Sequence, residues 1–419
     1  MRRRLLPAAL LAVGALAAPA VAVPVGQPLP VPGFASDNVE WLGNIPLHAD
    51  TAGAHLLDDH LYVTSSTQLS IYDVSTPESP QLRSTIPSPQ QAYFAEEDVD
   101  TNGEILLISA LSEIRVYDIT DKAAPVQIGS LRGGGDPHTI TCVLECRYAW
   151  GSEGQVYDLT DPRAPERVAQ LDWNQPQEGF QRPGQTHDVT EVAPGMVLTS
   201  TRFPTLFDLS DPLAPRIVAQ GATGDSRFIH ANLWPREMQD RWLLVGGETA
   251  ASDCSDPRGG AFMTWDTTDW EETRRFELVD EYRPAANGVQ NGEGVVETYC
   301  SHWFTPRPGW EDGGQLAVGW YEHGTRFLEV DDDGQIEEIG FFAPVGTTSS
   351  AAYWVTDEIV YVLDYTRGLD VVRFTGDQPA RGSAPVTTGL LAGGLAPDAP
   401  PARRPRVTPA MLDGENWRC

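Results

Sequence analysis

The sequence predicts an all-β chain folded as a seven-bladed β-propeller, and three observations support this prediction. An aromatic-Asp-aliphatic motif recurs at Asp73, Asp118, Asp158 and Asp208, at intervals of 45, 40 and 50 residues. Short segments rich in Val, Ile, Tyr and Thr surround each motif, and this composition is typical of strands. Glycine (39 residues) and proline (34) are too abundant for a mainly helical chain of 419 residues.

Each repeat unit has the same internal order. A short alternating strand comes first, as in residues 188–193, and an apolar strand follows, as in 196–200. The motif strand is third, and it leads into a Ser/Thr-Asp-Pro-x-x-Pro segment, which is expected to be a turn because Asp and Thr bond nearby N–H groups and Pro ends strand pairing. A last strand follows, as in 217–220, so each unit supplies the four antiparallel strands of a propeller blade.

Seven copies of the motif are present. The four clearest copies occupy residues 69–80, 114–125, 155–165 and 205–215, and the weaker copies occupy 264–269, 326–331 and 369–374. The seventh unit, residues 351–374, lacks a fourth strand, whereas residues 39–45 resemble the fourth strand of the other units. We therefore expect this N-terminal strand to close the last blade, which leaves no open sheet edge between the first and last blades.

The chain divides into four expected segments. These are a signal peptide at residues 1–22, an N-terminal lead at 23–53 that includes the closing strand 39–45, the propeller at 54–375, and a disordered Pro/Ala/Gly-rich tail at 376–419. Three arginines at positions 2–4, an apolar stretch and Ala20-Val21-Ala22 are typical of a cleaved export signal, of either the general or the twin-arginine type. An uncleaved membrane anchor is the alternative, but the apolar stretch is short. We expect a secreted or extracytoplasmic protein.

The repeated aliphatic-Tyr-Asp-(Val/Ile/Leu)-(Ser/Thr)-Asp-Pro-x-x-Pro units resemble the LVIVD repeats of bacterial secreted and surface proteins. The resemblance covers residues 54–375 and is strong in the first four units; the Pro-x-x-Pro turn is missing from the last three. It implies a β-propeller fold. It implies no particular reaction, and it carries no catalytic residues over to this chain.

The five cysteines are disulfide candidates, because export leads to an oxidising compartment. Three residues separate Cys142 from Cys146, a spacing that suits the two sides of a tight hairpin. Cys254 and Cys300 would then form a second, longer bridge, and Cys419 is left over. A zinc site at Cys142 and Cys146 is the alternative, but no second Cys or His pair follows at zinc-finger spacing.

Five of the eight histidines occupy the same place in five repeats, at the start of the first strand. They are His55, His138, His187, His230 and His302. The aligned residue is Glu97 or Asp98 in the second repeat, and it lies near Ser350 or Ala351 in the seventh. Because the first strand of each blade lines the central channel of a propeller, these side chains are expected to form a ring at one mouth of the channel.

Two interpretations of this ring are open. Converging neutral imidazoles are common transition-metal ligands, so three or four of the histidines could hold copper, iron or zinc, with Glu97 or Asp98 as a ligand or as a partner of one. Some propeller enzymes do hold iron or copper in histidine rings, which is an analogy at the level of the fold alone. The other interpretation is a hydrated channel in which repeat duplication copied one histidine into each blade.

Composition limits the partners. Asp and Glu outnumber Lys and Arg by 59 to 29, and a net charge of −30 disfavours nucleic acid, whose phosphates are bound by basic residues. We expect no membrane span once the signal is removed, and a monomer that binds an extracellular protein or a small ligand. The leading hypothesis is a non-enzymatic extracellular binding or scaffold module with a histidine-lined central channel, in which a transition metal is one option and no cofactor is the other. The alternative is a metal-dependent enzyme resembling an oxidoreductase, in which Glu97 or Asp98 moves protons.

Overall fold

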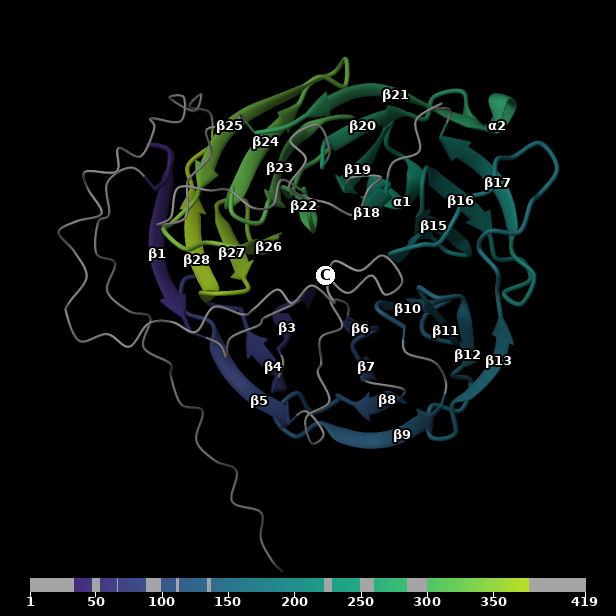
Figure 1. Ribbon diagram of the computed structural model, residues 1–419. Coiled ribbons are helices and arrows are strands. Elements are labelled where there is room, and N and C mark those ends of the chain that lie inside the picture. The colour runs from purple at the N-terminus through teal and green to yellow at the C-terminus, as the bar shows by residue number, and fades with distance from the viewer. Residues whose placement is uncertain are drawn as a thin grey trace, which may run out of the picture.

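The computed structural model is a seven-bladed β-propeller, as the sequence predicts (Figure 1). The structure describes residues 34–46, 53–65, 67–87, 99–110, 113–133, 137–221, 228–248, 260–284 and 300–376. The predicted signal peptide and all of the predicted tail after Gly376 lie outside the described residues. Within them, no helix is long and apolar enough to cross a membrane.

The first four blades follow the chain from the inner strand outward. Blade 1 contains β2 (Ala54–Leu57), β3 (His60–Thr64), β4 (Gln68–Asp73) and β5 (Gln81–Pro87). Blade 2 contains β6 (Val99–Thr101), β7 (Ile105–Ala110), β8 (Glu113–Asp118) and β9 (Val126–Arg132). Blade 3 contains β10 (Ile140–Val143), β11 (Tyr148–Gly151), β12 (Gln155–Asp158) and β13 (Glu166–Gln170). Blade 4 contains β14 (Val189–Ala193), β15 (Met196–Ser200), β16 (Pro204–Asp208) and β17 (Arg216–Gly221).

The remaining blades complete the ring. Blade 5 contains β18 (Phe228–Leu233), β19 (Trp242–Glu248), β20 (Phe262–Asp266) and β21 (Arg275–Tyr282), with two short helices, α1 (Pro235–Met238) and α2 (Trp270–Thr273). Blade 6 contains β22 (Phe304–Pro306), β23 (Gly314–Gly319), β24 (Thr325–Val330) and β25 (Ile336–Phe342). Blade 7 contains β26 (Ser349–Trp354), β27 (Ile359–Asp364), β28 (Gly368–Phe374) and β1 (Val39–Ile45). The outer strands of blades 4 and 5 also touch, because β17 pairs with the start of β21 in parallel.

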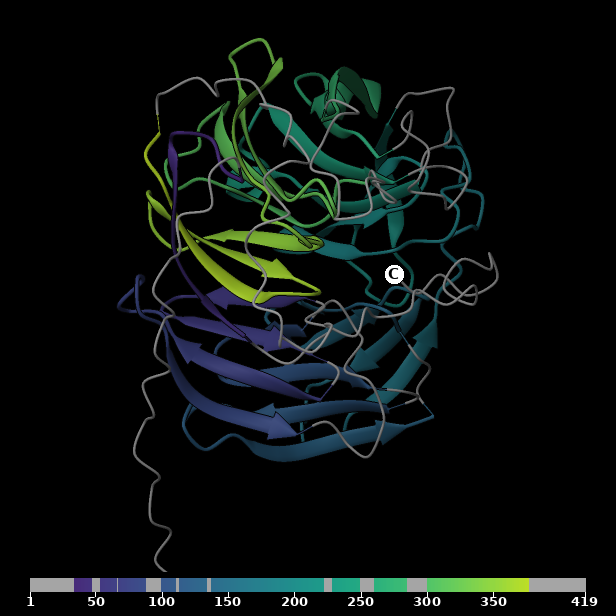
Figure 2. The ribbon, with the colours of Figure 1, turned by 60° about the vertical axis from the view of Figure 1, so that its left-hand side comes forward.

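The N-terminal strand closes the ring, which confirms the prediction for residues 39–45. β1 pairs antiparallel with β28, in a register that runs from Val39 opposite Phe374 to Ile45 opposite Leu369. Figure 2 shows the purple N-terminal strand beside the yellow-green strands of the last blade. The buried Asp370 carboxylate strengthens this seam, because it accepts hydrogen bonds from Trp41 Nε1 at 3.0 Å and from Asn44 Nδ2 at 2.9 Å.

The repeated aspartate organises the turn after the third strand. In blades 1 to 5, one carboxylate oxygen of this residue accepts the backbone N–H two positions further on, at 2.7–3.0 Å. The pairs are Asp73 with Ser75, Asp118 with Thr120, Asp158 with Thr160, Asp208 with Ser210 and Asp266 with Thr268. The motif therefore recurs in these blades because each of them has the same side-chain-capped turn.

The hydrophobic core lies between neighbouring blades. Tryptophans on the middle strands fill these layers: Trp150 of blade 3 packs in one cluster with Val189 of blade 4, and Trp242 of blade 5 packs with Leu316 of blade 6. These apolar layers between the blades hold the inner strands in fixed positions around the axis. The inner strands carry the residues of the candidate site.

Candidate functional site near the central axis

The predicted histidines lie on or just before the inner strands. His55 lies in β2 and His230 in β18, whereas His138, His187 and His302 each precede the inner strand of their blade by two residues. The inner strands are the ones nearest the axis in Figure 1, where β6, β10, β18, β22 and β26 are labelled. Glu97 and Asp98, the predicted carboxylates, lie outside the described residues.

Four of the histidines form a continuous row across blades 3 to 6, and we call His138, His187, His230 and His302 the histidine cluster. The ring centroids of His138 and His187 lie 4.7 Å apart, those of His187 and His230 4.0 Å apart, and those of His230 and His302 3.7 Å apart. His187, His230 and His302 are buried, and His138 is half-buried. The repeat register therefore brings these four rings together.

A shared rule orients three of the five histidines: ring Nδ1 faces an oxygen atom of the next blade. His187 Nδ1 lies 3.1 Å from the carbonyl oxygen of His230, and His302 Nδ1 lies 2.5 Å from that of Ser350. A carbonyl oxygen only accepts hydrogen bonds, so both rings carry a proton on Nδ1, and in the neutral imidazole the lone pair is then on Nε2. His55 Nδ1 lies 3.3 Å from Asp100 Oδ1 in blade 2, a contact that also favours a proton on Nδ1.

The Nε2 atoms of His138 and His187 lie 3.1 Å apart. A transition metal bound to both nitrogens by bonds of about 2.0–2.1 Å fits this separation with an N–metal–N angle of about 100°. A hydrogen bond between the two rings fits it equally well. Among the described residues, no group of three or more His, Cys, Asp or Glu side chains has the arrangement of a metal site.

Three carboxylates with raised pKa values surround the innermost strand of blade 3. Burial raises the pKa of Asp100, although nearby His55 and the N–H groups of Cys142 and Thr101 oppose the shift. Burial also raises the pKa of Asp188 to about 6, and the charge of Asp100 adds to this shift. The pKa of Glu191 is raised for the same two reasons. Sequence reasoning did not find these residues, because none of them stands at the histidine position of the repeat.

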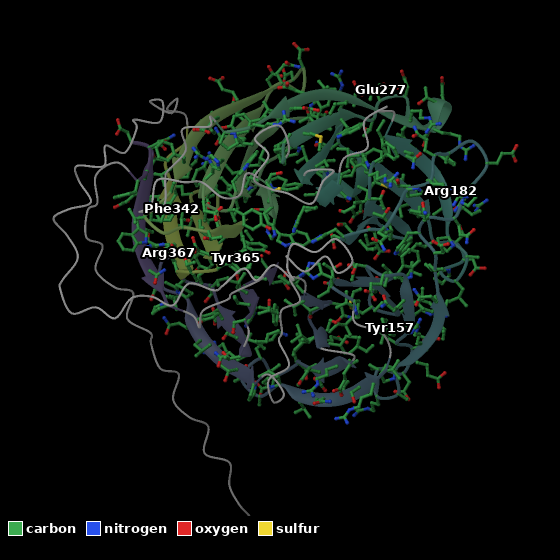
Figure 3. All side chains as sticks on the ribbon, in the orientation of Figure 1. Tyr157, Arg182, Glu277, Phe342, Tyr365 and Arg367 are labelled. Carbon is green, nitrogen blue, oxygen red and sulfur yellow. A yellow bond between two sulfur atoms is a disulfide. The ribbon has the colours of Figure 1, made fainter. Side chains whose placement is uncertain are left out.

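Aromatic side chains lie beside His230 and His302, at the blade 5 and blade 6 end of the histidine cluster. The ring of Trp303 lies 5.2 Å from that of His230, and the ring of Tyr321 lies 4.9 Å from that of His302. Tyr321 and Tyr365 stack nearly parallel with centroids 6.1 Å apart, and Figure 3 shows Tyr365 directed toward the axis. Tyr321 has a φ of 44°, a left-handed conformation that is costly for a tyrosine and is often found at functional sites.

The cysteines of blade 3 are joined close to this site. A disulfide links Cys142 and Cys146 across the turn between β10 and β11. Cys300, two residues before His302 of blade 6, is also disulfide-bonded, and its predicted partner Cys254 lies outside the described residues.

A separate surface hollow lies far out on blades 4 and 5, between the segment around Phe180 and helix α2. Its walls include Met196, Ile217 and Trp270, and the guanidinium of Arg274 lies 4.2 Å above the Phe180 ring. None of the histidines lines this hollow. The hollow is therefore separate from the histidine cluster and is not part of the candidate site.

Comparison with known structures shows the fold. The crystal structure of the β-propeller domain of Cps50 (Swd1) from Myceliophteria thermophila matches with a TM-score of 0.55 and 11% sequence identity, over 79% of this chain and 99% of that domain. No protein-family model matches the sequence, and no curated protein matches it. The chain is thus a β-propeller domain. What it binds is a separate question, which the histidine cluster addresses.

Proposed function

We propose that the protein is an exported binding module whose central channel holds a transition metal ion through the histidine cluster. The 3.1 Å separation of His138 Nε2 and His187 Nε2 carries this proposal. His187 donates its other ring N–H to a backbone carbonyl, which is how proteins orient metal-binding histidines. Copper, iron and zinc all accept imidazole ligands.

The remaining predicted ligands extend the same proposal. His302 directs Nδ1 at a carbonyl oxygen, as His187 does, and His55 directs Nδ1 at the carboxylate of Asp100. In the neutral imidazole, Nε2 is then the nitrogen through which each of them would bind a metal ion. Glu97 and Asp98 remain predicted partners of the site on the strength of the repeat alignment.

Export and the LVIVD-type classification belong to the proposal as well. The N-terminal Arg-Arg-Arg segment with its apolar stretch supports export, and the disulfides of Cys142 and Cys300 suit an oxidising compartment. The five Asp-capped turns of blades 1 to 5 support the LVIVD resemblance, because they follow the motif that defines it. The partner is an extracellular protein or small ligand, and the net charge of −30 disfavours nucleic acid.

A metal-dependent enzyme is the second candidate, and one observation favours it. Asp188 directly follows His187, and burial raises its pKa to about 6, so it can exchange a proton near neutral pH. Groups with such pKa values are typical acids and bases of active sites. An enzyme would bind its substrate at the metal and use Asp188 for proton transfer.

Metal analysis tests the proposal. Protein exported by its own signal should contain copper, iron or zinc in a ratio close to one ion per chain, and His138→Ala and His187→Ala should lose it. His60→Ala is the matched control, because this histidine lies on the second strand of blade 1, outside the cluster. A metal content that is well below one ion per chain, or that is unchanged in both cluster variants, contradicts the proposal.

A further inference from the structure

Asp100 connects three blades through its side chain. It lies in β6 of blade 2, its Oδ1 is 3.3 Å from His55 Nδ1 of blade 1, and its Oδ2 accepts the backbone N–H of Cys142 of blade 3 at 2.6 Å. Its Oδ1 also accepts its neighbour's N–H, from Thr101, at 2.7 Å. The carboxylate is buried, so these contacts hold it in one orientation.

The contact with His55 follows the pattern of the other blades, with one difference. In blades 4 and 6 the histidine Nδ1 meets a backbone carbonyl of the next blade, at His230 and Ser350. In blade 1 it meets a side-chain carboxylate. A carboxylate oxygen, like a carbonyl oxygen, can accept the Nδ1 proton, and in its ionised form it adds a charge to the contact.

Cys142 holds the carboxylate from the other side. The turn that follows it contains three consecutive residues in the left-handed region, Leu144, Glu145 and Cys146, with φ of 53–58°. The Cys142–Cys146 disulfide closes this turn, and the Glu191 carboxylate accepts the N–H of Leu144 at 3.0 Å. The N–H of Cys142 is thus presented to Asp100 from a cross-linked, tightly held segment.

We propose that Asp100 is a positioning residue for His55: it keeps the imidazole proton on Nδ1 and so makes Nε2 the nitrogen that His55 offers to a ligand. One part of this inference rests on the proposed function, namely that His55 belongs to the ligand site. The tautomer itself is a property of the protein alone and can be measured without any metal.

The decisive variant is Asp100→Asn. The carboxamide oxygen keeps the shorter hydrogen bond, from the Cys142 N–H, and gives up the one from the Thr101 N–H. The amide NH₂ group then faces His55 and donates to its Nδ1. The imidazole proton should therefore move to Nε2, which is the tautomer exchange expected when a histidine loses a carboxylate acceptor. Long-range ¹H–¹⁵N correlation spectra of the full chain labelled at histidine, recorded at pH 8, report the tautomer, and His55→Gln assigns the signal.

The wild-type protein should show His55 as the Nδ1–H tautomer, and Asp100→Asn should show it as the Nε2–H tautomer. Asp158→Asn, which alters an exposed turn of blade 3, should leave it unchanged. A wild-type signal of the Nε2–H form overturns the proposal without any variant, so the test survives even if Asp100→Asn does not fold. An unchanged tautomer in folded Asp100→Asn also overturns it.

Zinc binding then separates this inference from the proposed function. If His55 is a ligand, Asp100→Asn should weaken Zn²⁺ binding about 10-fold or more, the usual effect of removing a carboxylate behind a metal-binding histidine. A tautomer exchange together with unchanged Zn²⁺ affinity supports the positioning role and removes His55 from the ligand set. Failure of the wild-type protein to bind Zn²⁺, Cu²⁺ or Fe²⁺ contradicts the proposed function and leaves the tautomer result standing.

Discussion

His187 Nδ1 lies 3.1 Å from the backbone carbonyl oxygen of His230, one blade further round the ring. The same residue faces the preceding blade through Nε2, which is 3.1 Å from His138 Nε2. One imidazole therefore links three consecutive blades. Its orientation depends on the packing between blades, so the site and the stability of the propeller are coupled.

Gly319→Ala should test this coupling between blade packing and the site. A Cβ atom at this position would lie 2.6 Å from the carbonyl carbon of Ser350 and 2.7 Å from the nitrogen of Ala351, both of which are backbone atoms. Blades 6 and 7 must then separate locally, which should lower the free energy of unfolding by about 1–3 kcal/mol in urea denaturation. It should also move the Ser350 carbonyl away from His302. The exposed Val126→Ala should change stability by less than about 0.5 kcal/mol.

Asp158→Ala should show what the repeated aspartate contributes to each blade. The variant loses the hydrogen bond from the Thr160 N–H, at 2.8 Å, and should lower the free energy of unfolding by about 1 kcal/mol. Asp208→Ala removes the equivalent bond in blade 4, at 2.7 Å. Because the two turns are independent, the losses should add in the double variant. Glu166→Gln, on the exposed strand β13, serves as the control, and a loss from it as large as that from Asp158→Ala would contradict the turn's role.

Asp188 should make the metal-free protein less stable as the pH rises from about 4 to about 6. Its folded pKa is raised to about 6, above the ordinary value of 3.8, so the folded state binds the proton more tightly than the unfolded state does. The stabilisation is fully present below pH 3.8 and is lost as the pH passes through 6, by about 3 kcal/mol at most. Urea midpoints of wild type and Asp188→Asn, measured with a chelator present, should diverge over this range. Parallel pH profiles would show that Asp188 does not titrate as described.

Loss of the Cys142–Cys146 disulfide should have an unusually small effect on stability. Closing so short a loop, with a sequence separation of four, contributes about 2 kcal/mol by restricting the unfolded chain. The left-handed conformations of Leu144, Glu145 and Cys146 cost about 1 kcal/mol each, and the turn can relax once the bond is gone. The double variant Cys142→Ser/Cys146→Ser should therefore unfold within about 1 kcal/mol of wild type. A loss of 3 kcal/mol or more would mean that the turn keeps its conformation without the bond.

The repeat made much of this structure predictable. Equivalent positions in successive blades occupy equivalent places around the axis, so the alignment that found Asp73 and Asp118 also grouped His138, His187, His230 and His302. The same logic placed β1 in blade 7, because a missing strand and a spare strand complement each other.

Contacts that break the repeat were not predictable. Asp100 and Asp188 do not share the histidine register, and their roles depend on burial against blade 3, which the alignment does not describe. Tyr321 contacts His302, and its own backbone is in the left-handed conformation. Tyrosine rarely adopts this conformation, so the sequence does not suggest the contact. The orientation of the His187 imidazole depends on its contacts with His138 and His230 in the neighbouring blades. The repeat motif does not specify these contacts.

The pairing of β1 with β28 also has a consequence for synthesis of the protein. The pairing joins residues 39–45 to residues 368–374. β1 is synthesised before the other strands, and it cannot form this pairing until residues 368–374 have been synthesised. During synthesis the strands of blades 1 to 6 are made before β28, so the pairing edge of β1 has no partner strand until blade 7 is made. Ring closure is therefore a late event that spans the longest loop in the chain. A chain cut short before Gly368 would contain all the strands of blades 1 to 6 but would lack β28, the strand of blade 7 with which β1 pairs.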